Sequence, residues 1–183
     1  MIYQILSFLL EVVAGLLGGA CLLRLYMQVQ RVPFSNPVGR FVFAVTDWLV
    51  LPLRKVIPAL GRWDMASLVA AWLVKVAQFS LLWLLFGAHA GLIWVPVLAA
   101  FGLAQMAIGG LVVLLIVYVI LSWVQTDSPV GAIVERLCLP LLAPLRRHMP
   151  LVGGIDLSPL VLLVMLQVAA MVLSALQRSL LGG

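Results

Sequence analysis

Two stretches of the chain carry prolines, basic residues, a glycine and an aspartate in the same order, and side chains of these types could bind anionic groups. The first stretch contains the adjacent cations Arg54 and Lys55, and the second contains Arg146 and Arg147. A cation close to a membrane surface gains about 1 kcal/mol from anionic lipid headgroups. The candidate lipid- or partner-binding motif comprises Pro52, Arg54, Lys55, Pro58, Gly61, Asp64, Pro144, Arg146, Arg147, Pro150, Gly153, Gly154, Asp156, Ser158 and Pro159.

Membrane topology alone is a simpler explanation of the same basic residues. Cytoplasmic loops beside membrane spans are enriched in Lys and Arg whether or not they bind anything. Asp64 and Asp156 could pair with these arginines, and helix capping explains them equally well. Arg24, close to the end of the first apolar stretch, is expected to extend its guanidinium to the cytoplasmic surface.

Glu11 and Lys75 are charges inside long apolar stretches, where a charge is costly and often functional. One hypothesis pairs them, or places them along a polar seam that passes an ion or a proton, together with Gln78, Gln105 and Gln167. The alternative is that Glu11 lies nearer the outer interface and that packing satisfies Lys75. Neither charge recurs at the matching position in the second half, which argues against a conduction path.

The sequence offers little for enzyme chemistry. His89 and His148 are the only histidines, and Cys21 and Cys138 are the only cysteines, with no paired spacing. No glycine-rich phosphate loop or metal-ligand spacing accompanies them. We therefore expect no catalytic residues, no metal site and no cofactor, and we interpret both cysteines as packing residues.

The amino-acid composition of the chain indicates a membrane protein. Of the 183 residues 65% are hydrophobic and 9% are charged, with a mean hydropathy of +1.24. Residues 76–126 form 51 consecutive positions without Asp, Glu, Lys or Arg, too many for one crossing of about 20 residues. The chain must turn back, and residues 87–91 are its best helix-breaking cluster. The net charge of +5 comes mainly from loops beside the spans, so we expect no nucleic-acid partner.

The sequence therefore predicts an all-α membrane protein with about four transmembrane helices, over residues 2–28, 65–88, 92–124 and 158–176. Asn36-Pro37 and Ser128-Pro129 are typical helix starts, a capping residue followed by proline. Each opens an amphipathic helix that is expected to lie in the membrane interface or to re-enter the membrane. The prolines around each basic pair should end these helices, and Gly61 and Gly153 permit a turn back towards the bilayer.

Apolar spacing identifies the apolar stripes of these two amphipathic helices, which oppose Arg40 and Asp47 in the first and Glu135 and Arg136 in the second. In the first, Val38, Phe41, Val45 and Trp48 recur at helical spacing. In the second, the corresponding set is Val130, Ile133, Val134 and Leu137.

The two halves of the chain align without a gap at an offset of 92 residues, the distance from Arg54 to Arg146. Six of the thirteen positions in residues 52–64 are identical to those in residues 144–156. This predicts an internal duplication, with one repeat over residues 1–91 and a parallel repeat over 92–183. Basic residues then place both long loops in the cytoplasm and both termini outside. Because the first 23 residues contain no Arg, we expect a bacterial inner membrane rather than an organelle.

Small residues spaced four apart could allow helices to approach closely. Gly15 with Gly19 and Ala100 with Ala104 have this spacing. Packing within the chain is the simpler expectation, and formation of a homo-oligomer is the alternative.

The segment Pro140-Leu-Leu-Ala-Pro-Leu-Arg-Arg-His-Met-Pro-Leu-Val-Gly-Gly-Ile-Asp-Leu-Ser-Pro-Leu-Val, which follows Ser122-Trp123, resembles the signature of the YggT family, called YlmG in other lineages. The resemblance extends over both halves, although the first departs from it at Arg62 and Ser67. It implies an integral protein of bacterial inner membranes or thylakoids without established catalytic residues. It also implies links to osmotic tolerance with ion uptake, cytochrome assembly, and division or nucleoid organisation.

Taken together, these observations favour a non-enzymatic membrane scaffold, or an assembly or stress-adaptation factor. Its cytoplasmic face would bind membrane lipids or a partner membrane protein. The alternative function is an ion channel or transporter subunit involved in osmotic tolerance.

Overall fold

The computed structural model describes residues 1–58, 60–86, 92–124, 128–148 and 156–181, and these residues are helical apart from short connections. Six α-helices and one 3-10 turn, Leu92–Trp94, lie within these ranges. The helices are α1 (Ile2–Val29), α2 (Pro37–Arg54), α3 (Met65–Phe86), α4 (Val95–Val124), α5 (Pro129–His148) and α6 (Ser158–Leu181).

Four of these helices, α1, α3, α4 and α6, are long and apolar enough to cross a membrane. The prediction of four candidate spans in a multi-pass membrane protein is thereby confirmed, with adjusted limits. The third span begins as the 3-10 turn and becomes α-helical at Val95, and the fourth continues past residue 176. The predicted breaker at 87–91 lies outside the described residues.

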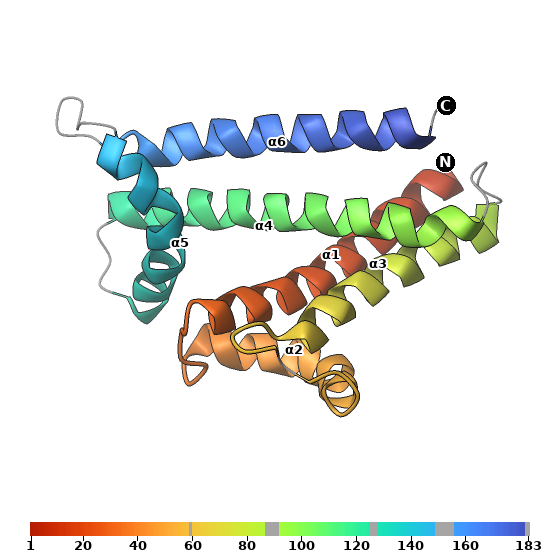
Figure 1. Cartoon of the computed structure of the whole chain (residues 1–183), viewed down its shortest axis with the longest axis horizontal. Coiled ribbons are helices and arrows are strands. Elements are labelled where there is room, and N and C mark those ends of the chain that lie inside the picture. The colour runs from red at the N-terminus through yellow and green to blue at the C-terminus, as the bar shows by residue number, and fades with distance from the viewer. Residues whose placement is uncertain (59, 87–91, 125–127, 149–155, 182–183) are drawn as a thin grey trace.

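The spans form an open arrangement rather than a closed bundle (Figure 1). Helices α1 and α3 lie side by side, α4 packs against both, and α6 packs along α4. Helix α2 contacts α1 and α3, whereas α5 contacts α4 and α6. In Figure 1 the start of α1 and the end of α6 lie at one end, away from α5 and from the loop between α1 and α2.

The capping signals correctly locate the starts of both amphipathic helices. Asn36 Oδ1 accepts a hydrogen bond from the Gly39 amide at 2.7 Å, and Ser128 Oγ accepts one from the Gly131 amide at 3.0 Å. Both helices end between the two prolines expected to end them, α2 at Arg54 after including Pro52, and α5 at His148 after including Pro144. A proline removes only one helical hydrogen bond, and the helix tolerates that loss near its end.

Helix α2 presents its predicted apolar stripe outward. Its buried residues are Gly39, Val42, Thr46 and Val50, whereas Phe41 and Trp48 are 56% and 63% exposed. The apolar stripe of α2 is therefore not its packed face. Exposed aromatic side chains are compatible with a helix surrounded by lipid. In α5 most of the stripe is packed, because Ile133, Val134 and Leu137 are buried.

Close packing of the spans uses a different glycine from the predicted pair. A Cβ added at Gly18 would lie 2.8 Å from Met106 Sδ, so α1 and α4 approach closely at this point. A Cβ added at Gly15 or Gly19 would meet nothing within 4 Å. The expectation that Gly15 and Gly19 pack within the chain is therefore wrong, because the contact lies on the neighbouring helix face.

Candidate functional site

Arg24 is the centre of a buried polar cluster that joins α1 to α2. Its side chain is 2% exposed, and Nη1 donates to Asp47 Oδ1 at 2.6 Å and to Thr46 Oγ1 at 2.8 Å. The guanidinium also lies 4.5 Å from the centroid of the Phe43 ring. The expectation that Arg24 reaches the membrane surface is wrong, because α2 covers it and supplies its partners.

Asp64 joins the end of α2 to the start of α3. Its side chain is 1% exposed and pairs with Arg54, and Ser67 Oγ donates to it at 2.7 Å. Arg24 Nε lies 3.8 Å away. Gly61, with φ of +62°, sits in the turn that precedes Asp64, and the backbone of Leu60 and Trp63 closes this turn. Asp64 thus both pairs with an arginine and caps a helix. We call Arg24, Asp47, Arg54, Asp64 and Ser67 the first junction.

The balance of burial and hydrogen bonding keeps Asp64 ionised. Burial opposes the charged carboxylate, but the hydrogen bonds from Arg54 and Ser67 outweigh it and lower the pKa of Asp64 below its ordinary value. Arg24 Nε is buried without a hydrogen-bond partner, and Asp64 Oδ2 lies 3.8 Å from it. The main ion pair of Arg24 is the one with Asp47, so Asp64 adds a second, longer-range compensation for this buried cation.

A second junction, made of Tyr118, Arg146, Asp156 and Ser158, joins α4, α5 and the start of α6. Arg146 contacts Asp156 through Nε at 2.8 Å and through Nη2 at 2.7 Å, and Nη2 also donates to Tyr118 Oη at 2.8 Å. The Ser158 amide and hydroxyl both donate to Asp156 Oδ1. Burial raises the pKa of Asp156, but the bonds from Ser158 and Arg146 outweigh it and lower this pKa. The aspartate is much more exposed than its counterpart, at 30% for Asp156 against 1% for Asp64, whereas Arg146 and Arg54 are similarly exposed at 36% and 40%.

Each basic pair therefore divides into an inner arginine and an outer cation. Arg54 and Arg146 are held by aspartates, whereas Lys55 and Arg147 are exposed and form no ion pair with the described part of the chain. The sequence motif did not distinguish the two members. Of the two members of each basic pair, the outer cation is therefore the one without an ion pair among the described residues.

Helix α5 packs against α1, the loop after α1 and the first half of α2. Tyr26 Oη donates to the Leu137 carbonyl at 2.7 Å, which ties α1 to α5. Arg136 Nη2 donates to the Arg31 carbonyl at 3.1 Å, which ties α5 to the loop after α1. A buried cluster that includes Met27, Val42 and Leu137 fills this contact. We call the surface formed by α2, α5 and their adjoining loops the basic face.

The rest of the predicted motif is only partly described. Pro52 and Pro58 are exposed, and Ser158 and Pro159 are buried at the start of α6. Three predicted motif residues, Pro150, Gly153 and Gly154, lie outside the described residues, as does His89. Within the described ranges no group of three or more His, Cys, Asp or Glu side chains could hold a metal ion.

The intramembrane polar residues are dispersed rather than aligned. Lys75 is 8% exposed, and its Nζ donates to Gln78 Oε1 at 2.8 Å. Gln105 instead donates to Gln177 on α6 at 2.9 Å. Glu11 and Gln167 are exposed, and no Glu11–Lys75 ion pair occurs among the described residues. The predicted seam is therefore not assembled in this conformation.

Sequence reasoning missed the association of Arg24 with Thr46 and Asp47. The available signal was a polar residue, Thr46, among apolar neighbours on one side of α2. A lone arginine near the end of a span and a threonine in an amphipathic helix each have an ordinary explanation, so the pattern alone could not join them.

Comparison with known proteins places the chain in a family. The CCB3/YggT family model matches residues 3–85 and 97–177. The uncharacterized protein YggT of Escherichia coli K12 is 39% identical over 97% of this chain and 96% of the relative. An uncharacterized protein in the proC 3′ region of Vibrio alginolyticus is 35% identical over 90% of each chain. No solved structure matches. The match of the family model to most of the residues and the identity to these relatives confirm the resemblance, and the chain belongs to the CCB3/YggT family.

Proposed function

We propose that this protein is a non-enzymatic membrane scaffold, or an assembly or stress-adaptation factor. In this proposal its basic face lies in the cytoplasm and binds anionic lipid headgroups or a partner membrane protein. The observation that carries the proposal is the division of each basic pair. The inner arginines, Arg54 and Arg146, form ion pairs with aspartates. The outer cations, Lys55 and Arg147, are exposed and form no ion pair with the described residues. Cations that serve only folding would be expected to have partners.

The proposal includes two tandem repeats that enter the membrane in the same direction. The recurrence of the arginine–aspartate contact after 92 residues, from Arg54–Asp64 to Arg146–Asp156, supports it. The two separate segments matched by the family model also support it. Two spans in each repeat would bring both amphipathic helices to one side of the membrane. The contacts between α5 and the loop after α1 agree with this arrangement.

The side chains of α2 support its proposed placement in the membrane interface. Arg40, Asp47 and Arg54 lie on one side of the helix, and the exposed apolar residues Phe41, Trp48 and Leu51 lie on the adjacent side. Such a helix can turn one side to lipid and the other to headgroups. The outer cation Lys55 then comes directly after the helix, at headgroup depth.

Lipid capture by purified protein tests the proposal. Lys55→Gln combined with Arg147→Gln removes two outer cations, which at about 1 kcal/mol each should weaken binding of phosphatidylglycerol about 30-fold. Arg178→Gln is the matched control, because Arg178 is an exposed cation near the end of α6. Equal lipid affinity in wild type and the double variant would contradict the lipid arm of the proposal.

Affinity capture from native membranes with the same variants tests the protein-partner arm. A partner that binds through the outer cations should be lost from the double variant and retained by Arg178→Gln. Recovery of the same proteins with wild type and both variants would contradict a partner role for the outer cations.

A second candidate function is an ion channel or transporter subunit involved in osmotic tolerance. The observation that favours it is Lys75, a buried cation at membrane depth. Ion flux through liposomes that contain wild type, but not Lys75→Leu, would support it. Absence of flux with the wild type would remove it.

A further inference from the structure

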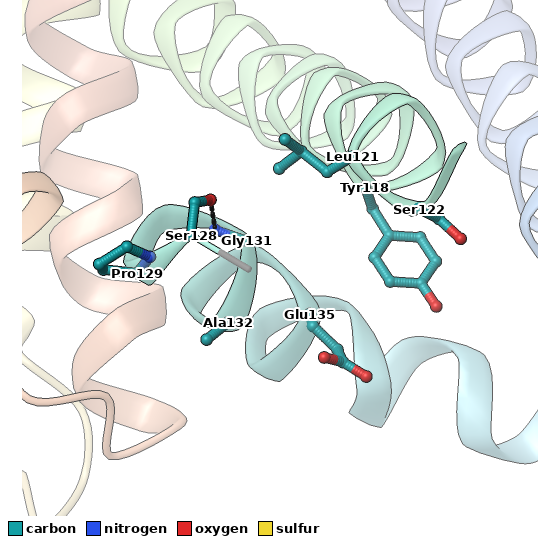
Figure 2. A pocket seen from close by; sticks show the side chains of 8 residues that line it. All are labelled: Tyr118, Leu121, Ser122, Ser128, Pro129, Gly131, Ala132 and Glu135. Carbon is teal, nitrogen blue, oxygen red and sulfur yellow. Dashed lines mark hydrogen bonds between the residues drawn. The ribbon is translucent and has the colours of Figure 1, made fainter. Parts of the chain in front are cut away.

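A hollow of about 530 Å³ opens on the basic face between the end of α4 and the first turns of α5 (Figure 2). Tyr118 and Ser122 line it from α4, and Ser128 and Glu135 line it from α5. Figure 2 shows Tyr118 and Glu135 projecting from the two helices on either side of the same space. The hollow lies where a span meets an amphipathic helix, the depth at which lipid headgroups are found.

Glu135 is the unusual member of this lining. Asp47, Asp64 and Asp156 each pair with an arginine. Glu135 is exposed and forms no ion pair within the described ranges, although its neighbour is Arg136 and the surrounding face is rich in arginine. A carboxylate that remains free on such a face is available to a cation from outside the chain.

The corresponding place in the first half is closed by aromatic side chains. Position 43, which is 92 residues before Glu135, is Phe43. The Phe43 ring stacks on Phe34 with centroids 4.6 Å apart, and Arg24 covers it. This comparison rests on the tandem repeats that form part of the proposed function. In it, the second repeat has a carboxylate and a hollow at the position where the first has a packed aromatic pair. The hollow is therefore specific to the second half.

We propose that this hollow binds a primary ammonium group, that of an aminophospholipid headgroup. The Glu135 carboxylate and the Ser122 hydroxyl are acceptors for the ammonium N–H groups. Tyr118 Oη accepts from Arg146 at 2.8 Å, which leaves its own proton free to donate to the phosphate of the same headgroup. A zwitterionic headgroup thus meets an acceptor for its cation and a donor for its anion.

This site differs in chemistry from the anionic-lipid contact of the outer cations. A headgroup with a negative charge alone would be repelled by Glu135, whereas Lys55 and Arg147 attract it. The two contacts can therefore be tested separately in the same purified protein.

Competition between lipids in nanodiscs, read by native mass spectrometry, tests the proposal. Phosphatidylethanolamine and phosphatidylcholine share the phosphate, but the trimethylated amine of the latter has no N–H to donate. We expect wild type to retain phosphatidylethanolamine about tenfold over phosphatidylcholine, and Glu135→Gln to abolish this preference. Glu11→Gln is the matched control, because it removes an exposed carboxylate from the outer half of α1 and should leave the preference intact.

Two further arms complete the test. Millimolar ethanolamine that displaces the lipid from wild type but does not bind Glu135→Gln would support the ammonium site with a soluble amine as its source. Lys55→Gln with Arg147→Gln should keep the ethanolamine preference even where it loses phosphatidylglycerol, so failure of the outer-cation contact is distinguishable. No preference in wild type, or the same preference in Glu135→Gln, would overturn the proposal.

Discussion

Removal of the Asp64 charge should destabilise the protein far more than the same change at Asp156. The variant Asp64→Asn keeps the size of the side chain and one acceptor oxygen but loses the negative charge. Asp64 is 1% exposed, pairs with Arg54 and accepts a hydrogen bond from Ser67. The variant places an amide N–H group among these donors, and a buried polar group left without its partner costs up to about 3 kcal/mol.

Asp156→Asn is the matched control, since Asp156 makes the equivalent contact with Arg146 in an exposed setting, at 36% and 30%. Exposed ion pairs contribute about 0–1 kcal/mol. Unfolding in mixed micelles titrated with SDS, followed by tryptophan fluorescence, measures both changes. We expect Asp64→Asn to lower the free energy of unfolding by about 3 kcal/mol and Asp156→Asn by about 1 kcal/mol or less. Equal losses of unfolding free energy in the two variants would refute the inference that the deeper burial of Asp64 makes its contacts the more important for stability.

Three further outcomes follow from the same contacts. The lowered pKa of Asp64 stabilises the fold above its unfolded value of about 4, so stability should fall as the pH drops through the lower folded pKa, and Asp64→Asn should abolish this step in acid titration. Gly39→Ala places a Cβ 2.5 Å from the Phe34 carbonyl oxygen and should cost about 1–3 kcal/mol in the same unfolding assay, whereas Gly15→Ala meets no atom within 4 Å and should be neutral or slightly stabilising. Burial raises the pKa of Cys138 to about 12 against the lowering effect of Arg146, so a maleimide at pH 8 should label Cys138 only after unfolding; rapid labelling of folded protein would contradict its burial.

Hydropathy and capping chemistry predicted the helices because both act locally. The long uncharged stretch required apolar helices that reverse direction, and the Asn36-Pro37 and Ser128-Pro129 pairs placed two helix starts at the correct residue. The prolines located the helix ends less closely, because α2 includes Pro52 and α5 includes Pro144. A single missing amide at Pro52 costs little where α2 is about to end.

The buried face of α2 could not be predicted from apolar spacing. In water an apolar stripe must be the packed one, whereas a helix bounded by lipid on one side can expose Phe41 and Trp48 and bury Thr46. Thr46 is buried because Arg24 donates to it, a contact between residues 22 positions apart. Local patterns carry no information about such pairings. The same limit explains why the motif did not separate Arg54 from Lys55.

We infer that the chain crosses the bilayer four times with both basic segments on one side. Single-cysteine variants Lys55→Cys, Arg147→Cys and Ile93→Cys test it, since all three positions are exposed and the native Cys21 and Cys138 are buried. A membrane-impermeant maleimide is added to right-side-out and to inverted inner-membrane vesicles. With both basic segments in the cytoplasm, we expect positions 55 and 147 to be labelled only in inverted vesicles and position 93 only in right-side-out vesicles. Labelling of positions 55 and 147 from opposite sides of the membrane would contradict it.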